Sequence, residues 1–370
     1  MKIVYDYQAF TFQKYGGISR YFYEIMKGIK KEKDYEVEIG VNYTENGYLG
    51  EIPHLGNYKA IQLGDFRGKV RLLNAINQYS TLRSLKEPYD IFHPTYYETY
   101  FLKRIGANPF VLTVHDMIHE KFPELFPERD LTAQNKALLV EKATKIIAIS
   151  ESTKKDLIDI LNVPEEKIEV IYHANSLVMP NEESEIVKKL PKRYVLFVGV
   201  RNGYKNFNNF IKAMTDLIHK DGELYVCCVG GGKFNEEEKA LLEELKIQER
   251  IVQIGVYDSD LTQVYRKALA FVFPSWYEGF GIPLLEAMYS GCPVITSNVS
   301  SLPEVAGEAA VYFDPYSEKE IQKSIEQVIY NEDLRKELIQ KGYKRNAQFS
   351  WNITVQKTRD VYRSLKPKQH

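Results

Sequence analysis

Two glutamates, Glu278 and Glu286, lie on either side of a glycine-containing loop that leads into a predicted helix. The loop carries Gly279 and Gly281, follows a buried apolar strand, and meets the helix at Pro283. Glycine lets the backbone come close to a ligand, and the free N–H groups at a helix start attract anions. The pattern predicts a phosphate joined to polyols, as in a nucleotide sugar, with a carboxylate on each side of it. The alternative is a plain turn, with Glu286 only balancing charge at the helix start.

Two cations, Arg201 and Lys205, follow another predicted buried strand, which runs to Gly199. Arginine offers a planar fork of donors and lysine a point charge, and both suit a diphosphate. If the diphosphate is a leaving group, these cations stabilise its charge as it develops, without a metal. Taken alone, two such cations are as readily explained by contacts with solvent.

Two weaker signals lie in the first half of the chain. Gly16 and Gly17 follow the first predicted strand at a helix start, where backbone N–H groups can meet an anion. They do not form GxGxxG, so NAD binding is not supported. His115 ends a predicted strand beside Asp116, and a neutral imidazole there can exchange hydrogen bonds with a substrate hydroxyl. A purely structural histidine is the alternative.

No metal and no cofactor is expected from the motifs. His115 and His119 have the spacing of helical zinc ligands, but His115 belongs to a strand end and HExxH is absent. The triplet 258–260 matches the DxD pattern of metal-binding sugar-transfer enzymes. It precedes an amphipathic helix, however, so we interpret it as an N-cap, and Ser301 with Glu304 as a capping box.

The elements that position these residues are short apolar runs separated by helix-length amphipathic stretches. Several runs are apolar at consecutive positions, which is typical of strands buried on both faces of a parallel sheet. Two successive βα series therefore predict an α/β protein with two doubly wound, Rossmann-like domains. The predicted strands lie in 2–7, 35–41, 91–95, 110–116, 145–150, 167–173, 194–200, 223–230, 251–256, 268–275, 292–297 and 309–315.

The domain boundary is predicted inside the aperiodic, proline-containing stretch 177–193. We assign 1–180 to the first domain and 181–350 to the second, and expect the last helix, within 351–370, to return to the first domain. Because ligands of open α/β sheets bind at the carboxyl ends of the strands, we expect a central cleft faced by both domains.

Composition narrows the classes of function. The 370 residues include 49 Lys and Arg and 50 Asp and Glu, a formal net charge of -1, which argues against binding nucleic acid along a whole surface. The three cysteines form no disulfide or zinc framework. No signal-peptide core is present, and no apolar run reaches the ~18–20 residues that span a bilayer. The sequence predicts a soluble, cytoplasmic protein.

Five stretches together resemble one family. They are FPSWYEGFGIPLLEAMYSGCPVITSNVSSLPEVAGEAAVYFDP (273–315), VGVRNGYKN (198–206), YGGISRY (15–21), TVHD (113–116) and FSWNIT (349–354). In this order they are similar to the landmarks of the family 4 glycosyltransferases, retaining enzymes of the GT-B fold. The resemblance covers nearly the whole chain, and its most specific part is the pair of glutamates with seven residues between them.

The resemblance implies that the second domain binds a nucleotide-sugar donor and that the first binds the acceptor. Many members carry arginine where this chain has Val200 or Tyr204, so the contact of Arg201 is shifted relative to the family's. The implied roles are ribose binding by Glu286, sugar binding by Glu278 and the backbone of Gly279, Phe280 and Gly281, and diphosphate binding by Arg201, Lys205 and the backbone from Ile282 to Leu284. His115 matches the histidine near the reacting sugar, and Gly17 the glycine of the first loop.

The implied reaction moves a hexose from a nucleotide-diphosphate sugar to a glycan or a polyprenyl-diphosphate-linked acceptor, in the synthesis of cell-surface polysaccharide. Anomeric configuration is retained, the diphosphate helps to take the acceptor proton, and no metal is needed. The alternatives are a sugar-nucleotide epimerase of the same fold and a non-catalytic nucleotide-sugar-binding protein. The first is disfavoured by the glutamate loop, the second by the presence of His115, Glu278 and Lys205.

One basic stretch bears on location. Residues 66–86 carry five cations, no acid and interspersed apolar side chains. Such a segment fits the anionic inner face of the plasma membrane, where the protein would be peripheral. An ordinary solvated helix explains it equally well.

Overall fold

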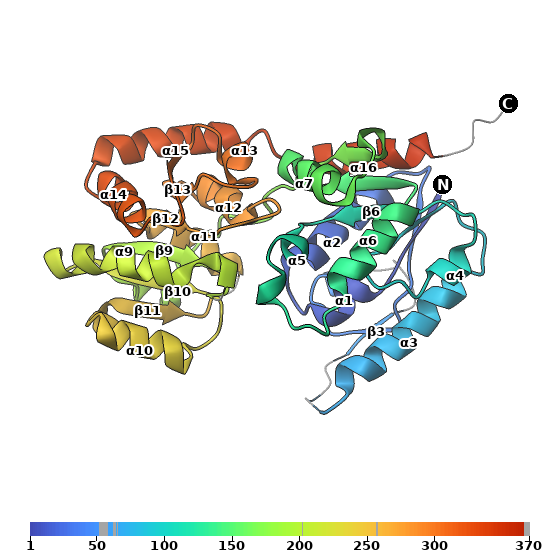
Figure 1. Cartoon of the computed structure of the whole chain (residues 1–370), viewed down its shortest axis with the longest axis horizontal. Helices are drawn as coiled ribbons and strands as arrows, with labels where there is room; N and C mark the ends of the chain where they lie inside the picture. The colour runs from blue at the N-terminus through green and yellow to red at the C-terminus, as the bar shows by residue number, and fades with distance from the viewer. Residues whose placement is uncertain (52–57, 62–63, 65, 202, 257, 366–370) are drawn as a thin grey trace. The chain divides into compact units, whose positions relative to one another are not determined.

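The computed structural model describes residues 1–51, 58–61, 64, 66–201, 203–256 and 258–365, so the end of the predicted last segment, 366–370, lies outside the described residues. The chain forms two compact units, Met1–His173 with Trp351–His370 and Ala174–Ser350 (Figure 1). The division lies ahead of the predicted one at 180/181. Residues 174–180 group with the second unit, where the Val178 carbonyl accepts a hydrogen bond from Thr262 Oγ1 (3.1 Å).

The sheet of the first unit is parallel throughout. One part has the order β2 (Glu36–Ile39), β1 (Lys2–Tyr5), β5 (Ile91–His93), and the other the order β6 (Val111–Val114), β7 (Lys145–Ala148), β8 (Ile168–Val170). A single bridge between Phe92 and Phe110 joins β5 to the second part. A short parallel pair, β3 (Tyr43–Thr44) and β4 (Lys59–Ala60), was not predicted, since two-residue strands leave no pattern.

The helices of the first unit follow its strands, as a doubly wound fold requires. Two helices follow β1, the second of which begins at Gly17, and a short helix follows β6 just after His115. The helical elements are α1 (Gln8–Phe12), α2 (Gly17–Lys30), η1 (Leu49–Glu51), α3 (Lys69–Ser84), α4 (Leu102–Ile105), α5 (Ile118–Lys121), η2 (Pro123–Leu125), α6 (Thr132–Lys142), α7 (Glu151–Leu161), η3 (Glu165–Lys167) and α16 (Trp351–Ser364).

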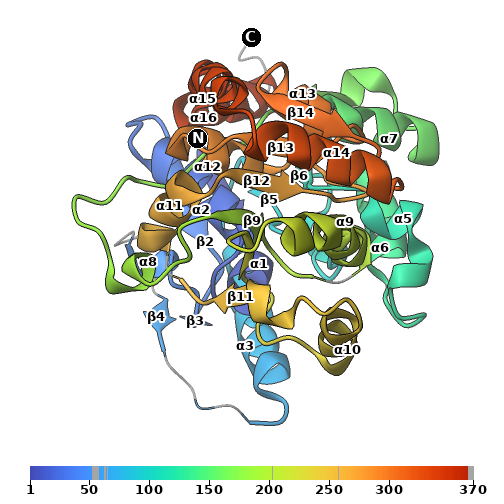
Figure 2. The ribbon, with the colours of Figure 1, turned by 90° about the vertical axis from the view of Figure 1, so that its left-hand side faces the viewer.

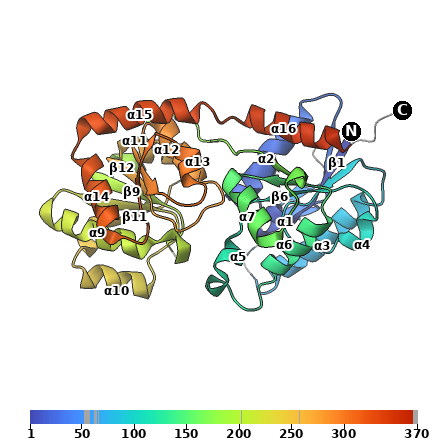
Figure 3. The same cartoon turned by 45° about the horizontal axis from the view of Figure 1, so that its top comes forward.

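The last helix, α16, packs on α2 and so returns to the first unit, as predicted (Figure 3). The two helices approach closely at Gly28, where an added Cβ would lie 2.4 Å from a methyl carbon of Val355. Further along α16, the Tyr362 hydroxyl is 2.8 Å from that of Tyr5 and 2.6 Å from His93 Nδ1. The first unit is therefore built from both ends of the chain.

The second unit has a six-stranded parallel sheet of order β11 (Ile251–Ile254), β10 (Tyr225–Val229), β9 (Tyr194–Val198), β12 (Ala270–Phe273), β13 (Val294–Ser297), β14 (Ala310–Phe313). Each predicted strand segment of both halves contains one of the observed strands. Helices α9 and α14 cover one face, and α11 and α12 the other (Figure 2). The helical elements are α8 (Glu185–Lys188), η4 (Gly203–Lys205), α9 (Phe207–Lys220), α10 (Glu236–Glu244), η5 (Gln248–Arg250), α11 (Asp258–Lys267), α12 (Ile282–Ser290), α13 (Leu302–Ala306), α14 (Glu318–Ile329) and α15 (Glu332–Asn346).

Candidate active site

The glycine loop joins β12 to α12 in the second unit. Strand β12 is buried along its whole length because its residues are apolar at consecutive positions. Gly281 is the N-cap of α12 and has a left-handed φ of 101°, which favours glycine. A Cβ there would also lie 3.0 Å from a methyl carbon of Leu302. Helix α12 starts at Ile282, so its first backbone N–H groups face the loop, as a site for an anion requires.

Lys205 and Glu278, which come from different predicted motifs, meet at the ends of two neighbouring strands. The Lys205 Nζ atom is 2.6 Å from Glu278 Oε1, and the two side chains are 15% and 13% exposed. The Ser275 hydroxyl donates to the same carboxylate oxygen over 2.6 Å. A hydrogen bond from Trp276 N to the Tyr204 carbonyl (2.8 Å) holds the two loops together. The arrangement places a cation next to a carboxylate that can accept hydrogen bonds from hydroxyl groups.

The backbone of the glycine loop is held by two serines in the turn between β13 and α13. The Glu278 N–H donates to Ser300 Oγ over 3.0 Å. The Ser301 hydroxyl donates to the carbonyls of Glu278 and Phe280, at 2.9 Å each. Ser301 makes no side-chain cap to α13, so the predicted capping box with Glu304 is wrong. Its hydroxyl points back to the loop because two carbonyls there would otherwise be buried without a donor.

Glu286 lies on α12 and is 9% exposed. The Tyr265 hydroxyl donates to its Oε2 over 3.2 Å. Burial, followed by the adjacent Glu286 charge, holds the pKa of Tyr265 well above its usual value, so this phenol stays a donor. The Glu286 carboxylate is thus oriented on the same helix whose start faces the glycine loop.

Arg201 is more buried than its predicted role suggests. Its side chain is 2% exposed, and Nε lies 2.9 Å from Glu238 Oε1. The guanidinium also donates to carbonyls of the loop after β10, including those of Gly230 (2.8 Å) and Gly232 (2.9 Å). The three glycines 230–232 all have left-handed φ values, 86°, 71° and 69°. Arg201 therefore holds the shape of this glycine loop, and its contact with a diphosphate stays a prediction.

In the first unit, His115 follows β6 and is 6% exposed. Its backbone N–H donates to the Tyr97 hydroxyl (2.9 Å), and its ring lies parallel to that of His173, with centroids 6.1 Å apart. Burial lowers the pKa of His115 to about 3, with smaller contributions from His93 and Lys136. Nε2 is buried and has no hydrogen-bond partner among the described residues. A neutral imidazole nitrogen is thus available to a polar ligand.

Gly17 opens α2, and Gly16 is its N-cap. A Cβ on Gly16 would lie 2.5 Å from side-chain atoms of Gln13. The Gln13 Oε1 atom accepts a hydrogen bond from the Ser19 N–H in the first turn (3.0 Å). The small residue therefore lets Gln13 fold over the start of this helix, and a role of Gly17 in ligand binding stays a prediction.

Two family models match the chain in succession. The model described as Glycosyltransferase Family 4 matches residues 15–174, and that described as Glycosyl transferases group 1 matches 178–345. This chain is a family 4 glycosyltransferase. The comparisons give no support to the alternatives of an epimerase or a non-catalytic binding protein.

This glycosyltransferase is 29% identical to the O-antigen chain mannosyltransferase B of Escherichia coli, over 99% of this chain and 100% of that protein. Two solved structures share its GT-B fold. Sucrose-phosphate synthase from Thermosynechococcus elongatus has a TM-score of 0.78 at 20% identity, covering 98% of both chains. Anabaena Alr3699/HepE, in complex with UDP and glucose, has a TM-score of 0.76 at 17% identity, covering 98% of this chain and 99% of that one.

A buried lysine near His115 in the glycosyltransferase was not predicted from the sequence. Lys136, on α6, is fully buried, and its Nζ donates to the Asp116 carbonyl and to Glu120 Oε2, at 2.9 Å each. The ammonium lies 5.1 Å from the centre of the Tyr97 ring, whose hydroxyl in turn binds the His115 N–H. A lysine in an amphipathic helix normally indicates a solvated face, so only the fold reveals that Lys136 fastens the turn after His115.

Asn206 was also missed. It has a left-handed φ of 58°, and its Nδ2 donates to the carbonyls of Pro274 (3.0 Å) and Pro315 (2.7 Å). It therefore ties the ends of β12 and β14 to the loop that carries Lys205. The available signal was an asparagine directly before a helix, which is a common cap, but here the amide bridges two other loops.

The structure places the two candidate metal-binding motifs, the triplet 258–260 and the His115–His119 pair, as follows. The triplet 258–260 lies in the first turn of α11. The His119 ring stacks on Phe126, with centroids 3.8 Å apart. Within the described part of the chain, no group of three or more His, Cys, Asp or Glu side chains is arranged to hold a metal ion. Among the same residues, none of the helices combines the length and apolarity needed to cross a bilayer.

Proposed function

We propose that this glycosyltransferase moves a hexose from a nucleotide-diphosphate sugar to a glycan or polyprenyl-diphosphate-linked acceptor in cell-surface polysaccharide synthesis. The observation that carries the donor assignment is the Lys205–Glu278 pair beside the glycine loop and the start of α12. The E. coli relative is an O-antigen chain mannosyltransferase and the HepE structure is a complex with UDP and glucose, which supports the acceptor and donor classes.

Each part of the donor has a matching group in the second unit. Lys205 and the first N–H groups of α12 suit the diphosphate, because both supply positive charge to an anion. Glu286, oriented by Tyr265, suits the hydroxyls of the ribose. Glu278 suits hydroxyls of the sugar, since its carboxylate accepts hydrogen bonds.

The proposed reaction retains the anomeric configuration. The acceptor hydroxyl oxygen forms a bond to the anomeric carbon on the face from which the diphosphate leaves. The bond from that carbon to the phosphate oxygen breaks, and the acceptor proton passes to the departing phosphate. Lys205 and the helix N–H groups stabilise the charge that develops on the leaving group, which is why the proposal includes no metal. Neutral His115 exchanges a hydrogen bond with a substrate hydroxyl through Nε2.

A panel of UDP-, GDP-, ADP- and dTDP-sugars in a thermal-shift assay identifies the donor, because a ligand that binds only the folded state raises Tm. The matching sugar is then used for transfer, with the configuration of the product read by NMR. We expect one nucleotide class to stabilise the enzyme, a product of the donor's configuration, and an unchanged rate with EDTA. No stabilisation by any donor, an inverted product, or activity abolished by EDTA would each contradict the corresponding part of the proposal.

We further propose that the enzyme acts in the cytoplasm, peripherally at the inner face of the plasma membrane. Around the start of α3, Phe66, Val70 and Leu72 are about half exposed beside the exposed cations Arg67 and Arg71. Exposed apolar groups interspersed with cations suit an anionic lipid surface.

Sedimentation with anionic vesicles tests the membrane contact. Arg67→Gln with Arg71→Gln should reduce binding, because each cation near an anionic surface contributes about 1 kcal/mol. Lys69 is left in place since it forms an ion pair with Glu45 (2.7 Å). Exposed Lys103→Gln with Arg104→Gln on α4 is the matched control. Unchanged sedimentation of the α3 variant would exclude the patch.

A further inference from the structure

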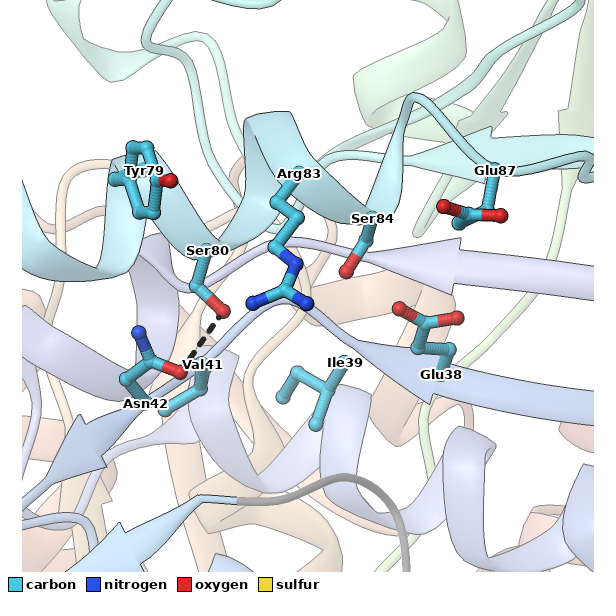
Figure 4. A pocket seen from close by; sticks show the side chains of 9 residues that line it. All are labelled: Glu38, Ile39, Val41, Asn42, Tyr79, Ser80, Arg83, Ser84 and Glu87. Atoms are coloured by element: carbon cyan, nitrogen blue, oxygen red, sulfur yellow. Dashed lines mark hydrogen bonds between the residues drawn. The ribbon is translucent and has the colours of Figure 1, made fainter.

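A groove of about 410 Å³ lies in the first unit, between α3 and the end of β2 (Figure 4). Ile39 and Val41 lie at its base but are only 3% and 2% exposed, so most of the surface open to a ligand comes from the other lining residues. The Tyr79 ring, 69% exposed, stands on the α3 side. Small-molecule sites typically enclose about 300–1,000 Å³, so the volume suits a small ligand or part of a longer one. None of the donor-binding or catalytic roles proposed above uses these residues.

The walls of the groove are fastened to each other. The Thr81 hydroxyl donates to the Gly40 carbonyl (2.8 Å), and Asn77 Oδ1 accepts from the N–H groups of Asn42 (2.9 Å) and Tyr43 (3.0 Å). A Cβ on Gly40 would lie 2.4 Å from Thr81 Oγ1, so the glycine permits this close approach. A groove held in this way needs little reorganisation when a ligand binds.

The polar groups of the groove include both donors and acceptors that the protein leaves unused. Among the described residues, neither the Arg83 guanidinium nor the Glu87 carboxylate has a hydrogen bond or ion pair. Their i, i+4 spacing would favour a pair inside a helix, but α3 ends at Ser84, so Glu87 lies beyond its last turn. Arg83 extends from α3 over Ile39, into the middle of the groove (Figure 4).

The charges select the class of ligand. Arg83 disfavours a cation and Glu87 disfavours an anion, whereas the Glu38 carboxylate is balanced by Lys2 at 2.7 Å. A neutral molecule with many hydroxyl groups satisfies both, because each hydroxyl can accept from the guanidinium and donate to a carboxylate. The exposed Tyr79 ring suits the C–H face of a sugar ring.

We propose that this groove binds neutral hexose units of the acceptor glycan, away from the end that receives the new sugar. The inference rests on the proposed function, because it takes the acceptor to be a glycan. A second point of attachment raises the effective concentration of a long acceptor without new chemistry. The groove should therefore lower KM for longer acceptors and leave kcat unchanged.

Tyr79→Ala and Arg83→Gln test the groove, since both side chains are exposed and their loss should not unfold the protein. Lys86→Gln, next to the same helix, and Lys103→Gln on α4 are matched controls outside the groove. Saturation-transfer NMR is recorded without donor, using neutral gluco-, manno- and galacto-tetrasaccharides, the free hexoses and a uronic-acid tetrasaccharide. We expect at least one neutral tetrasaccharide to bind, binding to weaken about tenfold or more in both groove variants, and the controls to behave as wild type.

Failure of this inference and failure of the proposed function give different results. If no neutral tetrasaccharide binds to the wild type, if the uronic-acid tetrasaccharide binds better, or if the groove variants bind as the wild type does, the groove proposal is overturned. Donor-induced stabilisation and transfer to a short acceptor are measured on the same proteins. Loss of these in the wild type would overturn the proposed function, whereas their presence with unaffected groove variants would overturn the groove alone.

Discussion

The polar groups near the strand ends of the two units differ in charge and in exposure. In the second unit the Lys205–Glu278 ion pair is 15% and 13% exposed at its side chains, so both charges reach the surface. In the first unit the corresponding position holds His115, neutral and 6% exposed, while the charge of Lys136 is fully buried behind it. The charged groups are therefore partly exposed in the second unit and buried in the first.

This difference in burial determines which ion pair can exchange its partners for a ligand. The Lys205–Glu278 pair is less deeply buried, so it can open when an anion binds Lys205 and hydroxyls bind Glu278. Breaking a buried pair costs about 3–5 kcal/mol, so the Lys136–Glu120 contact stays closed and acts by fixing the backbone after His115.

The largest expected effect comes from the exchangeable pair. Lys205→Ala and Glu278→Ala should each lower sugar transfer by about 10²–10³, because each removes a group aligned with the donor. Stability should change little, as measured by denaturant unfolding. The control is Lys212→Ala, which breaks an exposed pair with Glu318 (3.6 Å) in the same unit. Near-normal turnover of either active-site variant would remove that residue from the site.

Substitution of the buried Lys136 should instead affect mainly the stability of the protein. Lys136→Met leaves Glu120 buried without its cation, and should lower the free energy of unfolding by about 3–5 kcal/mol. Lys121→Met, which breaks the more exposed pair with Asp156 (2.9 Å), should cost about 0–1 kcal/mol. The double variant Lys136→Met with Glu120→Gln should regain part of the loss. Equal destabilisation by the two lysine variants would contradict the contrast between the sites.

Substitution of Arg201 tests whether this residue is a buried structural charge, like Lys136, or a ligand-binding group, like Lys205. Lysine keeps the charge but cannot reach Glu238 and several carbonyls at once, so Arg201→Lys should cost about 2–4 kcal/mol of stability. We expect a rise in KM for the donor of less than about tenfold, through the glycine loop 230–232. A stable variant with a hundredfold loss of kcat would instead indicate direct contact with the diphosphate.

Acid should act on the first unit through its buried histidines. Burial lowers the pKa of both His115 and His93 to about 3, whereas an unfolded histidine titrates near 6.5. Between these values the unfolded state binds more protons, so the free energy of unfolding falls as the pH decreases from about 6.5 towards 3. The slope is at most about 1.4 kcal/mol per pH unit for each histidine. Urea titrations between pH 7 and pH 4.5 should show a shallower slope for His115→Gln and no change for exposed His219→Gln.

The strands and the glycine loop between β12 and α12 could be predicted because their sequence signals are local. Consecutive apolar residues indicate buried strands, and Glu278 and Lys205 each lie in the connection after one. The roles of Lys136 and Arg201 depend on partners that only the fold supplies, since Glu238 is 37 positions from Arg201 in sequence. A charged side chain looks the same in the sequence whether it faces water or a buried carboxylate.

The hydrogen bond between Tyr5 and Tyr362 joins residues 357 positions apart in the sequence. During synthesis on the ribosome, the core of the amino-terminal half therefore cannot be completed until α16, which carries Tyr362, has been made. The middle of the chain, Ala174–Ser350, has all of its own strands and helices earlier. The half that is made first should thus be the last to finish folding, and a ribosome stalled before residue 351 should carry a nascent chain with α2 uncovered.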